Sequence, residues 1–196
     1  MFRRLFFPAL IVALACPVLA DDKKPAAPDD KAVMEAMMKH ATPGPFHKKL
    51  EPLVGDWTYQ ASFMMAPGTP EMKMSGTANR KWLLDGRFMS EHAKNEGGEA
   101  FEGMGVTGYD NASKKYTFVW IDSMTTTVGL AEGDVDSSGK VFTYRSNDYN
   151  PMFGQKIKGR NVITVKDNDH HQIDFYTTPP SGAEFKSGTI QFTRKK

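Results

Sequence analysis

Two charged residues lie among aromatic side chains in segments that have the alternation of β-strands. Arg80 is two residues from Trp82, and Asp122 alternates with Phe118 and Trp120. Residues two apart on a strand point to one side of a sheet, and an apolar pocket with a few charged anchors is typical of small-molecule sites. We therefore expect a cavity lined by Tyr59, Phe63, Arg80, Trp82, His92, Phe118, Trp120 and Asp122.

The same pattern allows a second interpretation, in which the rings fill a solid core. Arg80 and Asp122 would then form a structural ion pair or point outward. His92 shares strand parity with Phe88 and is therefore expected to face the cavity. The alternative is that His92 is exposed to solvent. Only one of the adjacent His170 and His171 can face inward.

Methionine is frequent, with 12 residues in the chain. Met34, Met37, Met38 and His40 lie at helical spacing, and thioethers are soft ligands for Cu(I). They are the weak candidates for a metal site. The alternative is deformable apolar packing against the rim of a barrel, at Met64, Met65, Met72 and Met74.

Enzyme motifs are missing from the sequence. It contains no Gly-x-Ser-x-Gly elbow, phosphate-binding loop or His-Glu-x-x-His pattern. Asp110 and Asp122 lie about 40 Å apart along an extended chain, too far for a catalytic pair within one strand. The sequence therefore favours a non-catalytic protein without a cofactor, and catalysis would require residues assembled only in space.

The first thirty residues are typical of an exported protein. Residues 1–20 combine Arg3 and Arg4 with an apolar run and a small-residue cleavage pattern, which predicts a signal peptide cut after Ala20. Cys16, the single cysteine, loosely fits a lipoprotein box, so a lipid anchor is the alternative. Residues 21–30 read as a flexible linker, and the mature protein would be secreted or periplasmic without a transmembrane span.

The charge balance disfavours a nucleic-acid partner. The formal charge is +2, and removal of the leader with Arg3 and Arg4 leaves 23 basic and 23 acidic side chains. A neutral protein lacks the general attraction for phosphates on which nucleic-acid binders depend.

The spacing then predicts the elements that would position the cavity. Residues 31–54 form a helical segment, capped by Asp29 or Asp30, whose second half covers a barrel end. Residues 55–196 form the barrel domain, because short alternating strands separated by Gly, Asn, Asp and Pro turns predict an antiparallel up-and-down meander. The expected strands are 56–65, 72–83, 87–94, 100–109, 115–122, 127–134, 141–146, 155–166, 171–177 and 184–194.

Closing about ten strands into a barrel removes the exposed edges of the sheet. Arg194 shares strand parity with two large apolar residues, Ile190 and Phe192, so we expect it to stack on Trp57 and bond backbone carbonyls. Gly55 and Trp57 on the first strand, with Arg194 on the last, resemble the calycin superfamily of lipocalins and fatty-acid-binding proteins. That resemblance implies a closed barrel.

A closer resemblance runs from Phe46 to Arg194. The motifs Leu53-Val54-Gly55-Asp56-Trp57, Gly86-Arg87-Phe88, Gly108-Tyr109-Asp110 and Val119-Trp120-Ile121-Asp122 resemble the bacterial secreted family called domain of unknown function 1579. The resemblance implies the barrel and export but no activity. The related nitrobindins hold haem through one histidine, which makes haem binding through His92 a further hypothesis.

Three functions remain open. The first is an exported, non-catalytic barrel that binds a small apolar or amphipathic molecule. The second is an envelope interaction module with a filled barrel, whose methionine-rich helix docks on a partner. The third is the handling of copper or haem.

Overall fold

The computed structural model describes residues 29–97, 100–150, 153–180 and 182–196. The predicted signal peptide, its cleavage after Ala20, Cys16 and residues 21–28 of the linker lie outside the described residues. Among the residues that are described, no helix is both long and apolar enough to cross a bilayer.

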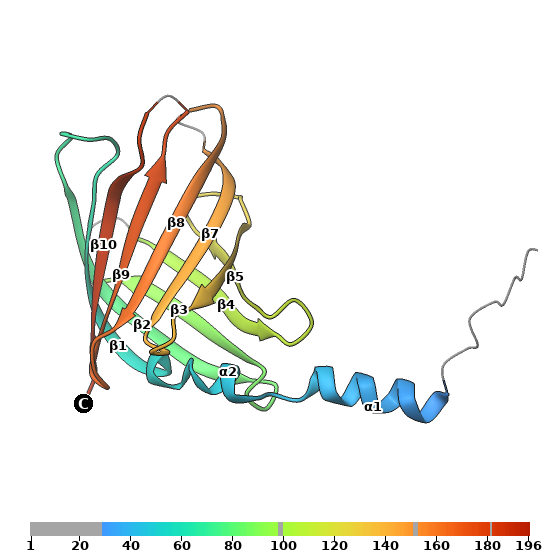
Figure 1. Ribbon diagram of the computed structural model, residues 1–196. Coiled ribbons are helices and arrows are strands. Elements are labelled where there is room, and N and C mark those ends of the chain that lie inside the picture. Colours follow the sequence, from blue (N-terminus) through green and yellow to red (C-terminus); the bar gives the residue numbers. More distant parts are fainter. Residues whose placement is uncertain (1–28, 98–99, 151–152, 181) are drawn as a thin grey trace, which may run out of the picture.

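Ten antiparallel strands form a closed barrel in which each strand pairs with the next and the last pairs with the first (Figure 1). This confirms the predicted up-and-down barrel with an N-terminal helical segment. The strands are β1 (Gly55–Phe63), β2 (Met72–Leu83), β3 (Phe88–Asn95), β4 (Glu102–Asp110), β5 (Lys115–Asp122), β6 (Gly129–Val135), β7 (Val141–Asn150), β8 (Gln155–Val165), β9 (His170–Thr178) and β10 (Phe185–Arg194).

The largest difference from the expected strands is at the end of β7. The predicted strand ends at residue 146, and the Asn and Asp residues that follow have low strand propensity. They continue the strand instead, since Asp148 pairs with Ile157 and Asn150 pairs with Gln155. Pairing with β8 outweighs the local preference and lengthens the wall of the barrel at this end.

One end of the barrel is covered by the segment that precedes β1. The short helix α2 (Pro45–Lys48) and the single 3-10 turn η1 (Glu51–Leu53) cross this end, as predicted for a lid (Figure 1). Leu50 and Leu53 are almost fully buried against rings from the lower barrel. The Tyr116 hydroxyl donates a hydrogen bond to the Phe46 carbonyl at 2.7 Å, which attaches the lid to the wall.

Helix α1 (Asp30–Ala41) projects away from this covered end and has no buried residue (Figure 1). Asp29 caps it by accepting a hydrogen bond from the Lys31 amide. Asn111, in the turn between β4 and β5, donates to the carbonyls of His40 and Thr42. The barrel therefore holds the end of α1 while the apolar side of the helix stays exposed.

The first and last strands meet at Trp57 and Arg194, which are directly paired in the register of β1 and β10. The Arg194 guanidinium lies 4.2 Å from the ring centre of the fully buried Trp57. It donates to the carbonyls of Val54, Pro52 and Asn168 at 2.7 to 2.9 Å. The predicted contact that closes the barrel is thus confirmed.

We expect Trp57→Ala to lower the free energy of unfolding by about 3–5 kcal/mol, because it removes a fully buried ring. Arg194→Ala should also destabilise the barrel, since it leaves three backbone carbonyls without their donor. Urea denaturation measures both effects, with Lys196→Ala at the exposed C-terminus as the control. Wild-type stability in both variants would show that this contact does not hold the barrel closed.

Candidate functional site

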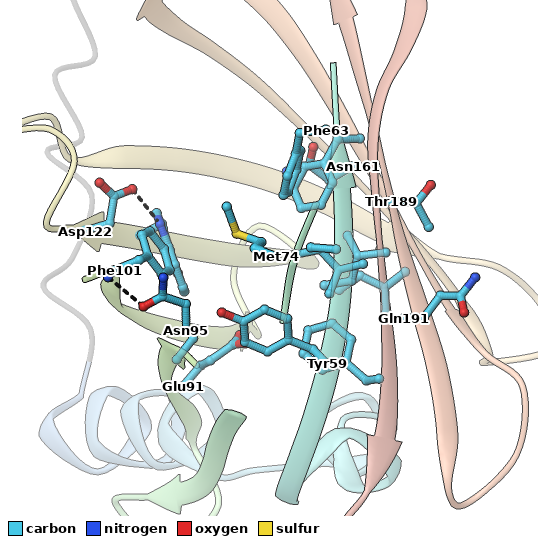
Figure 2. A pocket seen from close by; sticks show the side chains of 18 of the residues that line it. Tyr59, Phe63, Met74, Glu91, Asn95, Phe101, Asp122, Asn161, Thr189 and Gln191 are labelled. Carbon is cyan, nitrogen blue, oxygen red and sulfur yellow. Dashed lines mark hydrogen bonds between the residues drawn. The ribbon is translucent and has the colours of Figure 1, made fainter. Parts of the chain in front are cut away.

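The barrel encloses a cavity of about 1200 Å³. Leu53 of η1 contributes to its floor, and residues of the turns at the opposite end, including Gly97, Phe101 and Met124, border its mouth. Figure 2 shows side chains of β1, β2, β3 and β5 converging on this space, among them Tyr59, Met74 and Glu91. The lining is mainly apolar, so the cavity can accept an apolar body from the open end.

The cavity stays hollow because several rings lie flat against glycines of the wall. The Trp120 indole covers Gly103 and Gly105, so closely that an added Cβ on Gly103 would overlap the ring. Phe63 covers Gly188 in the same way. A larger residue at Gly103 or Gly188 would push the ring into the interior.

Arg80 is the centre of a buried polar cluster near the floor. Its side chain is 2% exposed, and Nη2 forms an ion pair with Glu91 at 2.9 Å. Its Nη1 donates to Nε2 of His171 on β9. Strands β2 and β9 flank the paired first and last strands, β1 and β10. The guanidinium also stacks on Phe192 at 4.5 Å. Arg80 therefore joins β2, β3, β9 and β10 at the floor.

His171 is held neutral in this cluster. Burial, together with the positive charges of Arg80 and Arg194, lowers its pKa from 6.5 to about 2. Because Arg80 donates to Nε2, the ring proton lies on Nδ1, which has no hydrogen-bond partner among the described residues. The ring is wedged between Phe192, stacked at 4.4 Å, and the edge of Trp57 at 4.3 Å.

Tyr144 borders the cavity with a phenol whose hydrogen-bonding capacity is unused by the described residues. Its side chain is 4% exposed, and its hydroxyl has no hydrogen-bond partner among the described residues. Burial raises its pKa further above the usual tyrosine value, so the phenol stays protonated and can donate. A buried hydroxyl left without a partner is costly, and an occupant with an acceptor atom would relieve that cost.

Acidic residues gather toward the mouth. Asp122 accepts hydrogen bonds from the Trp120 indole at 3.0 Å and from the amides of Met124 and Thr125 (Figure 2). Asp148 lies on the inward face of β7, and Glu96 follows the end of β3. The cavity therefore combines an apolar middle, a neutralised ion pair at the floor and carboxylates at the mouth.

Most of the residues expected to line the cavity do so. Its border includes Tyr59, Phe63, Arg80, Phe118, Trp120 and Asp122. Trp82 points the same way as Arg80 but lies at the covered end, where its indole donates to Glu51 at 2.8 Å. It packs against the lower core beneath the cavity and does not border it.

His92 is placed wrongly by the sequence prediction. It does share parity with Phe88, but both lie on the outer face of β3, where His92 contacts Glu102. The inward face of β3 carries Met89, Glu91 and Ala93 instead. His92 therefore cannot hold a haem inside the barrel, because its ring lies on the outer face.

Glu91, Tyr144 and His171 were not among the residues predicted for the site. Strand parity groups Glu91 with Met89 and Ala93, but Phe88 on the opposite face of β3 made that face an equal candidate for the interior. Parity also groups His171 with Ile173 and Phe175, which border the cavity. The sequence offered no signal that Tyr144 would lack a partner, because that depends on what lies opposite it.

The methionine-rich helix does not pack on Met64, Met65, Met72 and Met74. Those residues lie around the turn between β1 and β2 at the open end, whereas α1 leaves the covered end (Figure 1). Met34, Met37 and Met38 are 57 to 63% exposed. Copper binding by these thioethers and His40 stays a prediction. Within the described ranges, no group of three or more His, Cys, Asp or Glu side chains is placed to hold a metal ion.

Because His171 is buried and neutral, we expect the free energy of unfolding to fall on mild acidification. Below pH 6.5 the unfolded chain binds a proton that folded His171 does not bind until about pH 2, so unfolding becomes easier as the pH falls. The expected slope from this group approaches about 1.4 kcal/mol per pH unit between pH 6 and 5. The lowered pKa of the buried His47 acts in the same direction.

His171→Gln should reduce this slope while keeping an acceptor for Arg80, and denaturation curves at several pH values would measure it. His170→Gln is the matched control, because His170 is exposed beside a surface turn. Equal slopes in the wild type and His171→Gln would contradict the assignment of a neutral His171.

Comparison with known proteins agrees with the fold and adds no activity. The crystal structure of Rv2717c from M. tuberculosis superposes with a TM-score of 0.60 at 11% sequence identity, over 79% of this chain and 100% of that chain. At this identity the likeness shows the fold alone. No curated protein matches the chain. The family model described as "Protein of unknown function (DUF1579)" matches residues 42–194, and the chain therefore belongs to this family.

Proposed function

We propose that this protein binds a small apolar or amphipathic molecule inside its barrel. The observation that carries the proposal is the hollow interior of about 1200 Å³, at whose border the Tyr144 hydroxyl has no hydrogen-bond partner in the described part of the chain. Ligand cavities of this kind are mainly apolar, with a few polar groups that fix orientation. The proposal includes export from the cytosol, which the pattern of residues 1–20 supports.

The proposed role is binding and not catalysis. At the floor Arg80 bonds both Glu91 and His171, while Arg80 Nε and His171 Nδ1 have no partner among the described residues. His171 is shielded by Trp57 and Phe192 and held neutral by burial and nearby positive charge. These features suit a rigid floor beneath a ligand better than a group that exchanges protons during a reaction.

A substitution that fills the cavity tests this function. Ala93 is 6% exposed on the inward face of β3, so Ala93→Phe would place a ring in the interior. Native mass spectrometry of protein purified from the envelope should show a bound mass in the wild type and none in Ala93→Phe. Lys94→Phe, which places the same ring on the outer face of β3, should retain it.

A thermal-shift panel of lipids and metabolites extends the test to ligands lost during purification. A wild-type protein that carries no bound mass, and that no compound of the panel stabilises, would contradict the proposed function. A bound mass that survives in Ala93→Phe would place the ligand elsewhere.

A second candidate is self-association through α1. Val33, Met34, Met37 and Met38 form an exposed stripe on one helix. The same chain exposes a second apolar surface on the outside of β4, β5 and β6, where cross-strand pairing brings together Met104, Val106, Val119, Ile121 and Leu130. Contiguous exposed apolar surfaces can mark interaction sites. Two copies could bury both surfaces by exchanging α1 about a two-fold axis.

The double substitution Met34→Gln with Met37→Gln should convert such a dimer into a monomer, as measured by light scattering. Lys31→Gln with Lys39→Gln on the same helix is the control, because it places the same residue type on the charged positions. A wild-type protein that is monomeric at high concentration would contradict this candidate.

A further inference from the structure

The charged groups that border the cavity are unevenly distributed. Among the described residues, the bordering cations are Arg80 and Lys73, and the bordering carboxylates are Glu91, Glu96, Asp122 and Asp148. Arg80 and Glu91 neutralise each other at the floor. Lys73 is exposed and has the outward parity of its partner Ser62 on β1. The mouth is therefore acidic.

Arg80 is poorly suited to bind the carboxylate of a ligand. Both of its terminal nitrogens are engaged, Nη2 with Glu91 and Nη1 with His171, and the buried Nε is the guanidinium nitrogen without a partner among the described residues. An anionic head placed against Arg80 would also lie beside the Glu91 carboxylate, and like charges in contact are strongly unfavourable in a partly buried site. An anion entering by the mouth would first pass Asp122 and Asp148.

The mouth offers a cation both charge and aromatic surface. The hydrogen bonds that Asp122 accepts come from neutral donors, the Trp120 indole and two backbone amides, so its negative charge is not cancelled by them. Trp120 stacks with Phe118 at 6.0 Å on the same strand. Aromatic faces next to carboxylates are the surroundings that recognise alkylammonium groups in proteins.

A separate observation favours an occupant of the interior. Tyr144 lies on the inward face of β7, four residues before Asp148, which is about 13 Å along a strand. Its buried hydroxyl has no partner among the described residues and borders the cavity. One molecule of moderate length could thus extend from the phenol near the floor to the carboxylates at the mouth.

We propose that the barrel binds amphipathic molecules with a cationic head, which is held at the mouth by Asp122 and Asp148 while the apolar body lies between the aromatic rings. The Arg80–Glu91 pair below serves as a neutral floor and not as an anion site. This inference rests on the proposed ligand-binding function and adds the charge of the ligand to it.

Three probes with the same twelve-carbon chain test the inference: dodecyltrimethylammonium, 1-dodecanol and dodecanoate, each kept below its aggregation limit. Isothermal titration calorimetry or tryptophan fluorescence measures binding. Dodecyltrimethylammonium should bind at least about tenfold more tightly than dodecanoate, with 1-dodecanol between them, because only the head groups differ. Added salt should reduce the difference in affinity between dodecyltrimethylammonium and dodecanoate, since salt screens charges at the solvent-exposed mouth.

Two kinds of variant locate the effect. Asp148→Asn and Asp122→Asn should each weaken dodecyltrimethylammonium binding about threefold to tenfold and leave 1-dodecanol unchanged. Glu91→Gln should strengthen dodecanoate binding by a similar factor, because it leaves the positive charge of Arg80 without its counter-charge. Glu132→Gln on the outer wall of β6 is the control and should change none of the three affinities.

The outcomes separate the two proposals. If none of the three probes binds, the proposed ligand-binding function fails for amphipaths of this kind, and the inference fails with it. If 1-dodecanol binds and dodecanoate binds as tightly as dodecyltrimethylammonium or more tightly, the ligand-binding function stands and the cationic preference is overturned. Unchanged cation binding in both aspartate variants would overturn it as well.

Discussion

The contact between Arg194 and Trp57 is the interaction on which the rest of the barrel depends. Nine strand pairs follow from hairpins between neighbours, but the tenth joins the two ends of the meander. Arg194 fixes that pair by stacking on Trp57 and by donating to carbonyls of Pro52 and Val54. The same side chain also binds Asn168 in the turn before β9. One guanidinium thus holds together the lid, the first strand and the last three strands.

Gly55 belongs to this closure for a steric reason. Its φ of 129° lies in a region that favours glycine, and a Cβ there would overlap the Arg194 guanidinium. The Gly-x-Trp pattern therefore reflects two needs at the start of β1. The glycine lets the arginine approach the backbone, and the tryptophan, whose indole donates to the Leu53 carbonyl, fills the end of the barrel beneath it.

Sealing one end in this way leaves the rest of the interior open. Aromatic rings and the Arg80 cluster concentrate at the floor, whereas higher up Trp120 and Phe63 lie against glycines instead of meeting in the centre. The cavity is therefore a consequence of where the large side chains find room on the wall. Its polar groups are fixed by the same strands that close the barrel, so the floor of the cavity and the stability of the fold share residues such as Arg80.

The sequence predicted much of this arrangement and failed at identifiable points. The alternation of β1 and β5 placed Tyr59, Phe118 and Trp120 on the inner face, because large apolar residues on one face of a strand mark the buried side. On β3 both faces carry apolar and polar residues, so parity could not choose between Glu91 and His92. At β7 local propensity ended the strand too early, since the pairing with β8 was invisible in the sequence.

By itself the sequence determined the ten-stranded barrel, its covered end and the meeting of Trp57 with Arg194, because strand period, turn residues and terminal motifs are local signals. Only the tertiary structure decided that the interior is hollow, that Arg80 is neutralised by Glu91, and that no described residue bonds the Tyr144 hydroxyl. These properties depend on which side chains from distant strands face each other across the barrel. That pairing in space is set by closure, tilt and packing, and it leaves no pattern along a single strand.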